Sequence, residues 1–317
     1  MNREDTIKKI VAQSRTNLRQ ERLKRVHRDH LCETYQDRQR RKEQRAPHSG
    51  VAQSGGGTGG SGTQEWTDEY SFRFRGPSQD DFFETPRVAA IDINDAVTLS
   101  AWVRISTINT GEPGYIIDKV TASNGYGFKW QHTAGGYFEA RFYTFDGVIN
   151  KIIDLESPKG VYVVDTWYHV CATYESVSGI AKLYIDGTEV AAELFPLPNA
   201  PIKDANVPLL LGAGVPTPNN EFDGYIDEVS IWNVAFDQDE VNELYNAGAP
   251  SDLVTHSQVA NGVAWYRMGE NATYSTPGVP GGLWTMENAF NPATLLMSQT
   301  DPGPAGLTEA SRTSIVP

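Results

Sequence analysis

Two acidic residues spaced two positions apart are the candidate catalytic pair of this chain, because paired carboxylates can hydrolyse a glycosidic bond. Retaining glycosidases use two carboxyl groups about 5–5.5 Å apart. A Glu-x-Asp-x-Glu strand places them on one face because alternate residues share a face. The segment Glu221-Phe-Asp223-Gly-Tyr225 starts this pattern but has Tyr225 where the second Glu is required. We therefore interpret Glu221 and Asp223 as loop acids before a strand and expect no catalytic residue.

Other motifs for catalysis or metal binding are absent from the sequence. It has no His-Glu-x-x-His, no Cys-x-x-Cys, no Gly-x4-Gly-Lys-Ser/Thr and no dinucleotide fingerprint. His27, His30 and Cys32 are close in sequence but lack a fourth zinc ligand. The two cysteines, Cys32 and Cys171, lie in segments of different character. We expect both to be free thiols in a protein made in a reducing compartment.

Aromatic residues interleaved with glycines form a candidate carbohydrate site. The aromatic residues are Tyr126, Trp130, Tyr137 and Tyr143, and the glycines are Gly125, Gly127, Gly135 and Gly136. Aromatic faces stack on sugar rings, and glycines let a ligand approach the backbone. The alternative is that these aromatic side chains fill the core, which is the commoner role of aromatic residues in a β-sandwich.

Charge divides the chain into a basic arm and an acidic body. Residues 1–45 hold 14 of the 27 Lys and Arg residues but only 7 of the 40 Asp and Glu residues, within a net charge of −13. Residues 5–45 contain no Gly or Pro, which favours a helix. We expect residues 1–46 to anchor the protein or to self-associate through Ile7, Val11, Leu18, Arg19, Arg22, Arg25 and Arg28. Docking on an acidic protein surface is favoured over nucleic acid, because acids interrupt the bases and Tyr35 is the only interleaved aromatic residue.

A Gly/Ser-rich segment, residues 47–64, separates the arm from the body. Such a composition behaves as a flexible coil spanning roughly 20–25 Å. The chain shows no apolar run of about 18 residues, and its N-terminus has no apolar block behind its charges. We therefore expect neither a membrane-spanning helix nor a secretory signal.

The body, from about residue 65, alternates apolar and polar residues as half-buried strands do. The clearest strand runs from Val97 to Ile105, and Asp186-Gly187 suits the two-residue turn of a hairpin. Asp237 and Glu240 form a capping-box start for a single helix, with Val241, Leu244 and Tyr245 inward and Gly248 at its end. Many short strands joined by turns predict an all-β, two-sheet antiparallel sandwich.

Three motifs of the body resemble laminin-G-like domains of the concanavalin A-like jelly-roll superfamily. Residues 95–104, DAVTLSAWVR, resemble the family's "FTLSAWV" strand. Residues 167–174 with 182–187 resemble its "WHHVAATYDG…LKLYVDG" block, and residues 222–233 with 244–248 resemble its closing "G.IDEVRIWNRALS…LYNAG". The motifs follow in the family's order, and the resemblance implies a jelly-roll over residues 65–249.

The resemblance also implies a calcium ion, because many relatives hold one between the start of the sandwich and its last strand. Asp80 and Asp81 lie where the family has an early acidic loop, and Asp227 is the Asp of its "IDE" motif. Hard cations prefer several carboxylate and carbonyl oxygens. The alternative is a solvated pair of loop acids and an acid at a strand end. No other cofactor is expected.

Residues 250–317 carry a second resemblance. Residues 263–274, VAWYRMGENATY, with 284–288 and 294–298 after them, are similar to tails that follow such domains in virion proteins of tailed bacteriophages. Five prolines, at 277, 280, 292, 302 and 304, argue for irregular chain. We expect an extension packed on the sandwich, and the resemblance implies a virus particle.

These features predict a non-enzymatic structural appendage of a virion, of capsid or tail-fibre type, assembled in the host cytoplasm. The arm would bind other virion proteins, and a homo-oligomer would display the lectin-like domain at the particle surface. Several copies would raise the effective affinity for a host glycan by avidity. Neither nucleic acid nor membrane is an expected partner. One alternative is a cellular carbohydrate-binding adhesin, which predicts an export signal. The other is a glycoside hydrolase, which predicts the missing carboxylate pair.

Overall fold

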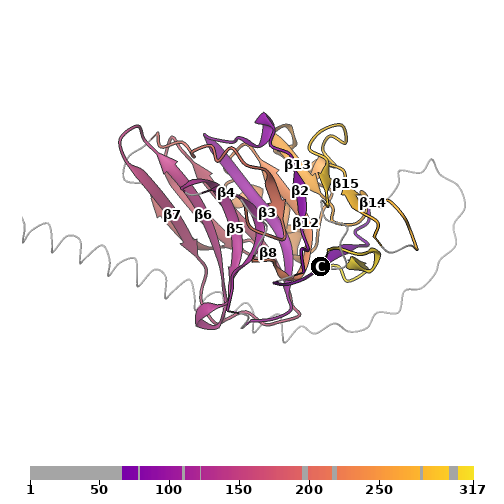
Figure 1. The fold of residues 1–317 in the computed structure, drawn as a ribbon. Helices are drawn as coiled ribbons and strands as arrows, with labels where there is room; N and C mark the ends of the chain where they lie inside the picture. The colour runs from indigo at the N-terminus through magenta and orange to yellow at the C-terminus, as the bar shows by residue number, and fades with distance from the viewer. Residues whose placement is uncertain are drawn as a thin grey trace, which may run out of the picture. The chain divides into compact units, whose positions relative to one another are not determined.

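A computed structural model describes residues 66–77, 79–108, 111–121, 123–194, 199–215, 220–278, 281–299 and 306–317. The predicted helical arm (1–46) and the Gly/Ser linker (47–64) lie outside the described residues. All described residues fall within one compact unit, Ser61–Pro317. They form two antiparallel sheets (Figure 1), which confirms the predicted all-β sandwich.

Sheet A is built around the longest strands. Its members are β1 (Ser71–Arg75), β3 (Ala96–Ile105), β8 (Trp167–Glu175), β9 (Ile180–Ile185), β10 (Thr188–Leu194), β12 (Asp223–Trp232), β13 (Gly262–Tyr266) and β17 (Arg312–Thr313). Their order is β10-β9-β8-β3-β12-β1-β17, and β13 also pairs with β12. β1 pairs with β12 from Asp223 to Ile226, whereas β13 pairs with it from Val229 onward. A gap between β1 and β13 therefore faces the intervening residues of β12.

Sheet B combines strands from the body with strands from the C-terminal extension. Its members are β2 (Phe83–Thr85), β4 (Gly114–Thr121), β5 (Asn124–Gln131), β6 (Tyr137–Phe145), β7 (Asn150–Glu156), β11 (Leu209–Leu211), β14 (Ala272–Tyr274), β15 (Trp284–Met286) and β16 (Met297–Ser298). Their order is β14-β15-β16-β2-β11-β4-β5-β6-β7. Residues of the extension thus continue both sheets despite their prolines.

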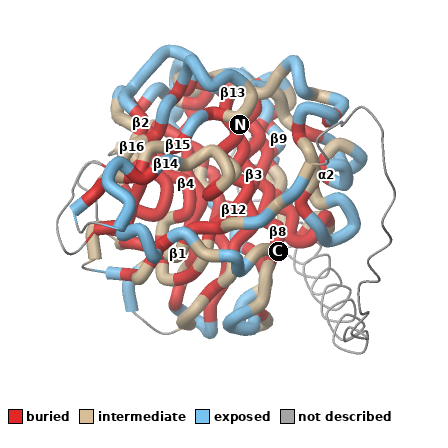
Figure 2. Tube along the Cα trace, turned by 90° about the vertical axis from the view of Figure 1, so that its right-hand side faces the viewer, coloured by how far each residue is buried: buried red, intermediate tan, exposed pale blue. Residues whose placement is uncertain are grey.

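The core lies between the sheets, and the alternation of the sequence accounts for it (Figure 2). In β3, Val97, Leu99, Ala101, Val103 and Ile105 are all at most 1% exposed. The opposite face of β3 is buried as well, because helix α2 (Gln238–Tyr245) and neighbouring chain cover sheet A. The described residues include no helix that is both long and apolar enough to cross a bilayer.

Local turn chemistry matches the sequence at two predicted points. Asp186 and Gly187 join β9 to β10 with φ of 50° and 70°, the paired positive values of a type I′ turn. The Asp237 side chain caps α2 and Glu240 reaches back to the Asp237 N–H, which completes the capping box. The helix ends earlier than predicted, at Tyr245, because Asn246 adopts the left-handed conformation two residues before Gly248.

Short 3₁₀ turns connect these elements. They are η1 (Ala89–Ile91), η2 (Thr133–Gly135), η3 (Asn246–Gly248), η4 (Leu253–Thr255), η5 (Val259–Asn261) and η6 (Glu309–Ser311).

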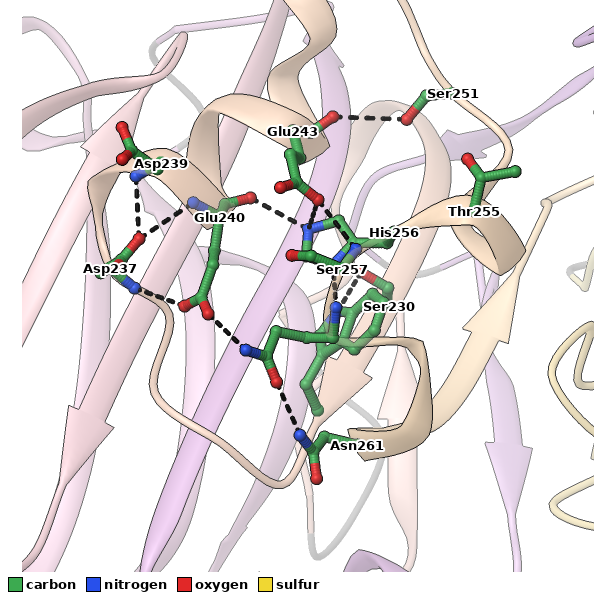
Figure 3. Close-up of polar contacts among 12 residues, drawn as sticks. Ser230, Asp237, Asp239, Glu240, Glu243, Ser251, Thr255, His256, Ser257 and Asn261 are labelled. Atoms are coloured by element: carbon green, nitrogen blue, oxygen red, sulfur yellow. Dashed lines mark hydrogen bonds and ion pairs between the residues drawn. The ribbon is translucent and has the colours of Figure 1, made fainter.

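The segment after α2 is fastened to the helix by buried His256 (Figure 3). His256 Nδ1 accepts the N–H of Gln258 at 3.0 Å, so Nε2 carries the proton and donates to the Glu240 carbonyl at 3.0 Å. Glu243 accepts the N–H of Ser257 at 2.8 Å. Under this cover, Cys171 of β8 is a free and fully buried thiol.

Candidate functional site

The four aromatic residues predicted to stack on sugars are all buried. Tyr126 and Trp130 point into the core, each 1% exposed, and the Tyr126 hydroxyl donates to the Ile91 carbonyl at 2.9 Å. Tyr137 and Tyr143 lie on the opposite, outer face of sheet B. They are 7% and 6% exposed because the cations of Lys159 and Arg141 lie over their rings. Tyr126 and Trp130 therefore fill the core, which is the alternative role that the sequence offered, whereas Tyr137 and Tyr143 lie beneath charged side chains on the outer face.

The glycines beside these aromatic residues make room for the protein's own atoms. A Cβ on Gly136 would lie 2.2 Å from the Trp130 ring, and one on Gly127 would lie 2.6 Å from Asp118 Oδ1. A Cβ on Gly125 would lie 1.8 Å from the Lys119 carbonyl oxygen. These three glycines serve internal packing, and their contacts give no sign of an approaching ligand.

The outer side of strands β4–β7 carries a charged and aromatic layer, which we call the outer polar face. It consists of Tyr115, Lys129, Glu139, Arg141, Tyr143 and Asp154. Glu139 lies 3.0 Å from both Lys129 Nζ and Arg141 Nη2, and Arg141 also pairs with Asp154. Lys129 lies over the Tyr115 ring at 5.5 Å. Registration between adjacent strands brings these alternating residues together, although they are far apart in sequence.

Asp118 of β4 lies buried beside this face. It is 1% exposed, and its Oδ2 accepts the N–H of Val215 at 2.9 Å. Burial raises the pKa of Asp118 to about 8, although Val215, Lys129 and Arg141 oppose that shift. Asp118 is therefore largely protonated at neutral pH and adds little negative charge to the outer polar face.

Ser100 and His169 form a serine–histidine pair on the outer side of sheet A. Ser100 Oγ lies 2.8 Å from His169 Nε2, and the two residues are 3% and 1% exposed. The Tyr245 ring packs against the His169 ring at 5.9 Å. Burial lowers the pKa of His169 to about 3. The pair is therefore buried where Tyr245 of α2 packs on the sheet, and a substrate cannot reach it.

The residues predicted for calcium do not come together. Arg75 binds both oxygens of the Asp81 carboxylate. Arg75 pairs with Asp223 in the sheet, whereas Asp227 lies four residues farther along β12, about 13 Å away at the rise of a strand. Asp80, the neighbour of Asp81, adopts φ 49° in its loop. The structure therefore does not bring Asp80, Asp81 and Asp227 together around one space.

A different acidic cluster occupies the gap between β1 and β13. Asp68, Glu228 and Glu270 each place a carboxylate oxygen within 4.8 Å of the others. A bulge in β12 gives Glu228 a φ of 46° and turns it into the gap. Glu270 Oε1 accepts the N–H groups of Glu69 and Tyr70 at 2.6 and 2.9 Å, which fixes the approach to β1.

Negative charge in this acidic cluster exceeds the positive charge beside it. Arg267 Nε lies 3.5 Å from Glu228 Oε1, and its guanidinium lies over the rings of Trp66 and Trp265. Burial, then the Glu270 carboxylate, raises the pKa of Asp68 to about 7. Burial, then the charge of Asp68, raises the pKa values of Asp227 and Glu228 well above their usual range. Several carboxylate oxygens around one small space suit a hard cation.

Sequence reasoning singled out Asp227, the neighbour of Glu228, but none of the three members of the cluster, Asp68, Glu228 and Glu270. Asp68 and Glu270 are 202 positions apart, so no local spacing links them. Glu228 follows Asp227 directly and would have pointed the other way in a regular strand. The bulge that turns it into the cluster has no signature in the sequence.

The sequence matches one protein family over half of its length. A laminin G-type profile, described as the Concanavalin A-like lectin/glucanases superfamily, matches residues 77–242. "Adhesion G-protein coupled receptor V1" of Danio rerio is 26% identical over 158 residues. That alignment spans 49% of this chain and 2% of the receptor, so the chain corresponds to a small piece of that protein.

Solved structures resemble parts of this chain at low sequence identity. A putative carbohydrate binding protein from Bacteroides ovatus has a TM-score of 0.50 and 16% identity, over 74% of this chain and 58% of that one. A heptameric SAP-like pentraxin from Limulus polyphemus has a TM-score of 0.42 and 14% identity, over 56% of this chain and 82% of that one.

Proposed function

Because the chain belongs to the concanavalin A-like lectin/glucanase superfamily, we propose that its sandwich is a non-enzymatic module that binds carbohydrate. The outer polar face is the observation that supports this proposal. It presents planar charged groups, which hydrogen-bond to hydroxyl pairs, beside tyrosine rings, which stack on sugar CH faces. Within this face, Arg141 covers the Tyr143 ring as a long, partly exposed side chain, and such a side chain can move aside for a ligand.

The non-enzymatic part of the proposal rests on how the acids are used. Asp223, the second acid of the interrupted glycosidase pattern, pairs with Arg73 at 2.7 Å and accepts the Thr107 hydroxyl at 2.7 Å. Its carboxylate is thereby engaged within the protein. Two-carboxylate hydrolysis requires a second free acid across the scissile bond.

Binding of the full-length protein to a glycan array tests the carbohydrate proposal. We expect Arg141→Ala to weaken binding at least tenfold, because it removes a planar donor from the centre of the face. Arg87→Ala is the matched control, since Arg87 also forms two carboxylate ion pairs but lies away from the face. Silence of the wild type across the array, or equal binding by both variants, would reject this role.

We further propose that the module is displayed on a virion, with residues 1–46 attached to other virion proteins in a homo-oligomeric appendage. The order of basic arm, Gly/Ser linker and lectin-like body supports this, as does the phage-like pattern of the C-terminal extension. Deletion of residues 1–46 should remove the protein from purified particles while glycan binding persists. Retention of the truncated protein on particles would contradict the anchoring role.

A further inference from the structure

Rows of directly opposite residues cross the outer polar face from strand to strand. One row runs through Asp118 of β4, Arg141 of β6 and Asp154 of β7. The next row places Lys129 of β5 opposite Glu139 of β6. Adjacent strands lie about 4.8 Å apart, so opposite charges on neighbouring strands are in direct contact. The charges of the face therefore act on a ligand as one group.

The guanidinium edges of Arg141 are engaged within the protein. Its Nε and Nη2 bind the two oxygens of Asp154, and Nη2 also lies 3.0 Å from Glu139 Oε1. Its Nη1 donates to the Tyr143 hydroxyl at 3.3 Å. A guanidinium binds a carboxylate through two parallel N–H groups on one edge, and Asp154 already occupies such an edge. Nη1 carries a second N–H, which suits a single hydroxyl oxygen.

Glu139 neutralises the other cation of the face. Its side chain is 5% exposed, and its Oε1 lies 3.0 Å from Lys129 Nζ. Its Oε2 accepts the side-chain amide of Gln131 at 2.8 Å. A ligand carboxylate that bound Lys129 in its place would leave Glu139 buried without a cation, which is costly. The ion pair therefore resists replacement by an anionic ligand.

The positive and negative charges of the face balance. Lys129 and Arg141 supply two positive charges, and Glu139 and Asp154 supply two negative charges. Burial raises the pKa of Asp118 to about 8, so this carboxyl group is largely uncharged at neutral pH. The face thus offers an anion no net attraction.

The protein around the face is acidic. Residues 46–317 hold 13 Lys and Arg residues against 33 Asp and Glu residues. Lys159, a cation at the margin of the face, is itself paired with Glu156 at 2.9 Å. The potential of the body therefore repels an anionic ligand at long range, and the balanced face does not reverse that repulsion.

We propose that the outer polar face binds an uncharged sugar and rejects sugars that carry a carboxylate or a sulfate group. An uncharged sugar needs no cation, because its hydroxyl groups both donate and accept hydrogen bonds. The Asp154 carboxylate, 40% exposed, can accept from such hydroxyl groups, and Arg141 Nη1 can donate to them. This inference rests on the proposed carbohydrate function and adds the charge class of the ligand.

Matched pairs of glycans test the inference with the full-length protein. Each pair consists of a neutral oligosaccharide and the same oligosaccharide capped with sialic acid. We expect the neutral member to bind at least tenfold more tightly. Its binding should stay the same between about 0.05 and 0.5 M sodium chloride, because there is no net charge between the partners for salt to screen.

Glu139→Gln is the informative variant, because it nearly keeps the side-chain volume but removes the charge that balances Lys129. The sialylated member should bind this variant at least tenfold more tightly than it binds the wild type. Glu189→Gln is the matched control, since Glu189 pairs with Lys182 on the other sheet, and it should bind as the wild type does. Asp154→Asn, which frees a guanidinium edge, provides a second test if Glu139→Gln fails to fold.

Preference of the wild type for the sialylated member, or equal binding of both members, would overturn the inference and leave the carbohydrate function in place. Unchanged selectivity in Glu139→Gln would do the same, as would unchanged selectivity in Asp154→Asn if Glu139→Gln does not fold. Binding to neither member of any pair would instead reject the carbohydrate function itself, and this inference with it.

Discussion

Arg75 holds Asp81 in a two-pronged ion pair. Arg75 Nη2 lies 2.6 Å from Asp81 Oδ1, Nε lies 2.8 Å from Oδ2, and the Asp81 side chain is fully buried. The Arg75 backbone N–H also donates to Oδ2 at 2.8 Å. This pair fastens the loop after β1 to the strand, so the predicted metal ligand Asp81 has a structural role.

Asp81→Asn should lower the free energy of unfolding by about 2 kcal/mol. The loss stays below the roughly 3–5 kcal/mol of a fully buried pair because Arg75 is partly exposed. Chemical denaturation in calcium and in EDTA should give the same difference from the wild type. Asp80→Asn is the control and should change stability by less than about 0.5 kcal/mol. A calcium-dependent loss in Asp81→Asn would show that Asp81 binds the ion after all.

Asp118→Asn should change how stability depends on pH. Burial raises the pKa of Asp118 to about 8, whereas an unfolded aspartate titrates near 3.9. Between about pH 4 and pH 8 the folded state therefore binds more protons than the unfolded state. Asp118 thus makes the free energy of unfolding fall as pH rises, and its contribution levels off above pH 8.

The variant lacks this titration and should gain stability relative to the wild type from pH 5 to pH 8, by at most about 5 kcal/mol. Urea denaturation at three pH values measures the gain. Stability curves that run parallel for the two proteins would mean that Asp118 is already ionised in the folded state.

Asp237→Ala should destabilise the protein by about 1 kcal/mol, because it removes the acceptor for the N–H groups of Asp239 and Glu240. Asp239→Ala removes an exposed acid from the same turn and should cost less than about 0.5 kcal/mol. Thermal unfolding of both variants provides the comparison. An equal loss in the two would assign the effect to the helix dipole instead of the cap.

Comparing Gly136→Ala with Gly147→Ala distinguishes two causes of lost stability, which are steric overlap of a new Cβ and backbone strain at positive φ. Both glycines have positive φ, 89° and 93°, but a Cβ on Gly136 would strike the Trp130 ring while one on Gly147 meets nothing within 4 Å. Both substitutions should lower the free energy of unfolding by about 1 kcal/mol because of backbone strain. Gly136→Ala should lower it by a further 1–3 kcal/mol or so because the new Cβ overpacks the core. Tryptophan fluorescence with denaturation checks this, and equal losses would indicate that the Trp130 ring moves aside freely.

The fold could be predicted because its signals are local. Alternation in β3, the Asp186-Gly187 turn and the Asp237 cap each depend on a few adjacent residues, and the structure confirms them. The strands of the extension escaped prediction because they are two to five residues long and separated by proline-rich chain. Their pairing depends on partners such as β2 and β12, which local patterns do not specify.

The candidate sites could not be predicted in the same way. Residue type alone does not say which face of β5 and β6 an aromatic side chain takes, and the register places Tyr126 and Trp130 in the core. The acidic cluster depends on contact between Asp68 and Glu270 and on the bulge at Glu228. These are tertiary features, and an isolated spacing cannot reveal them.

Cys171 lies in β8 beneath α2, and burial raises the pKa of its thiol far above that of a free cysteine. Electrophiles attack the thiolate, so a maleimide can modify Cys171 only after the helix and the segment behind it have lifted from the sheet. The rate at which Cys171 itself is alkylated under native conditions would therefore report how often that side of the sandwich opens, without heat or denaturant.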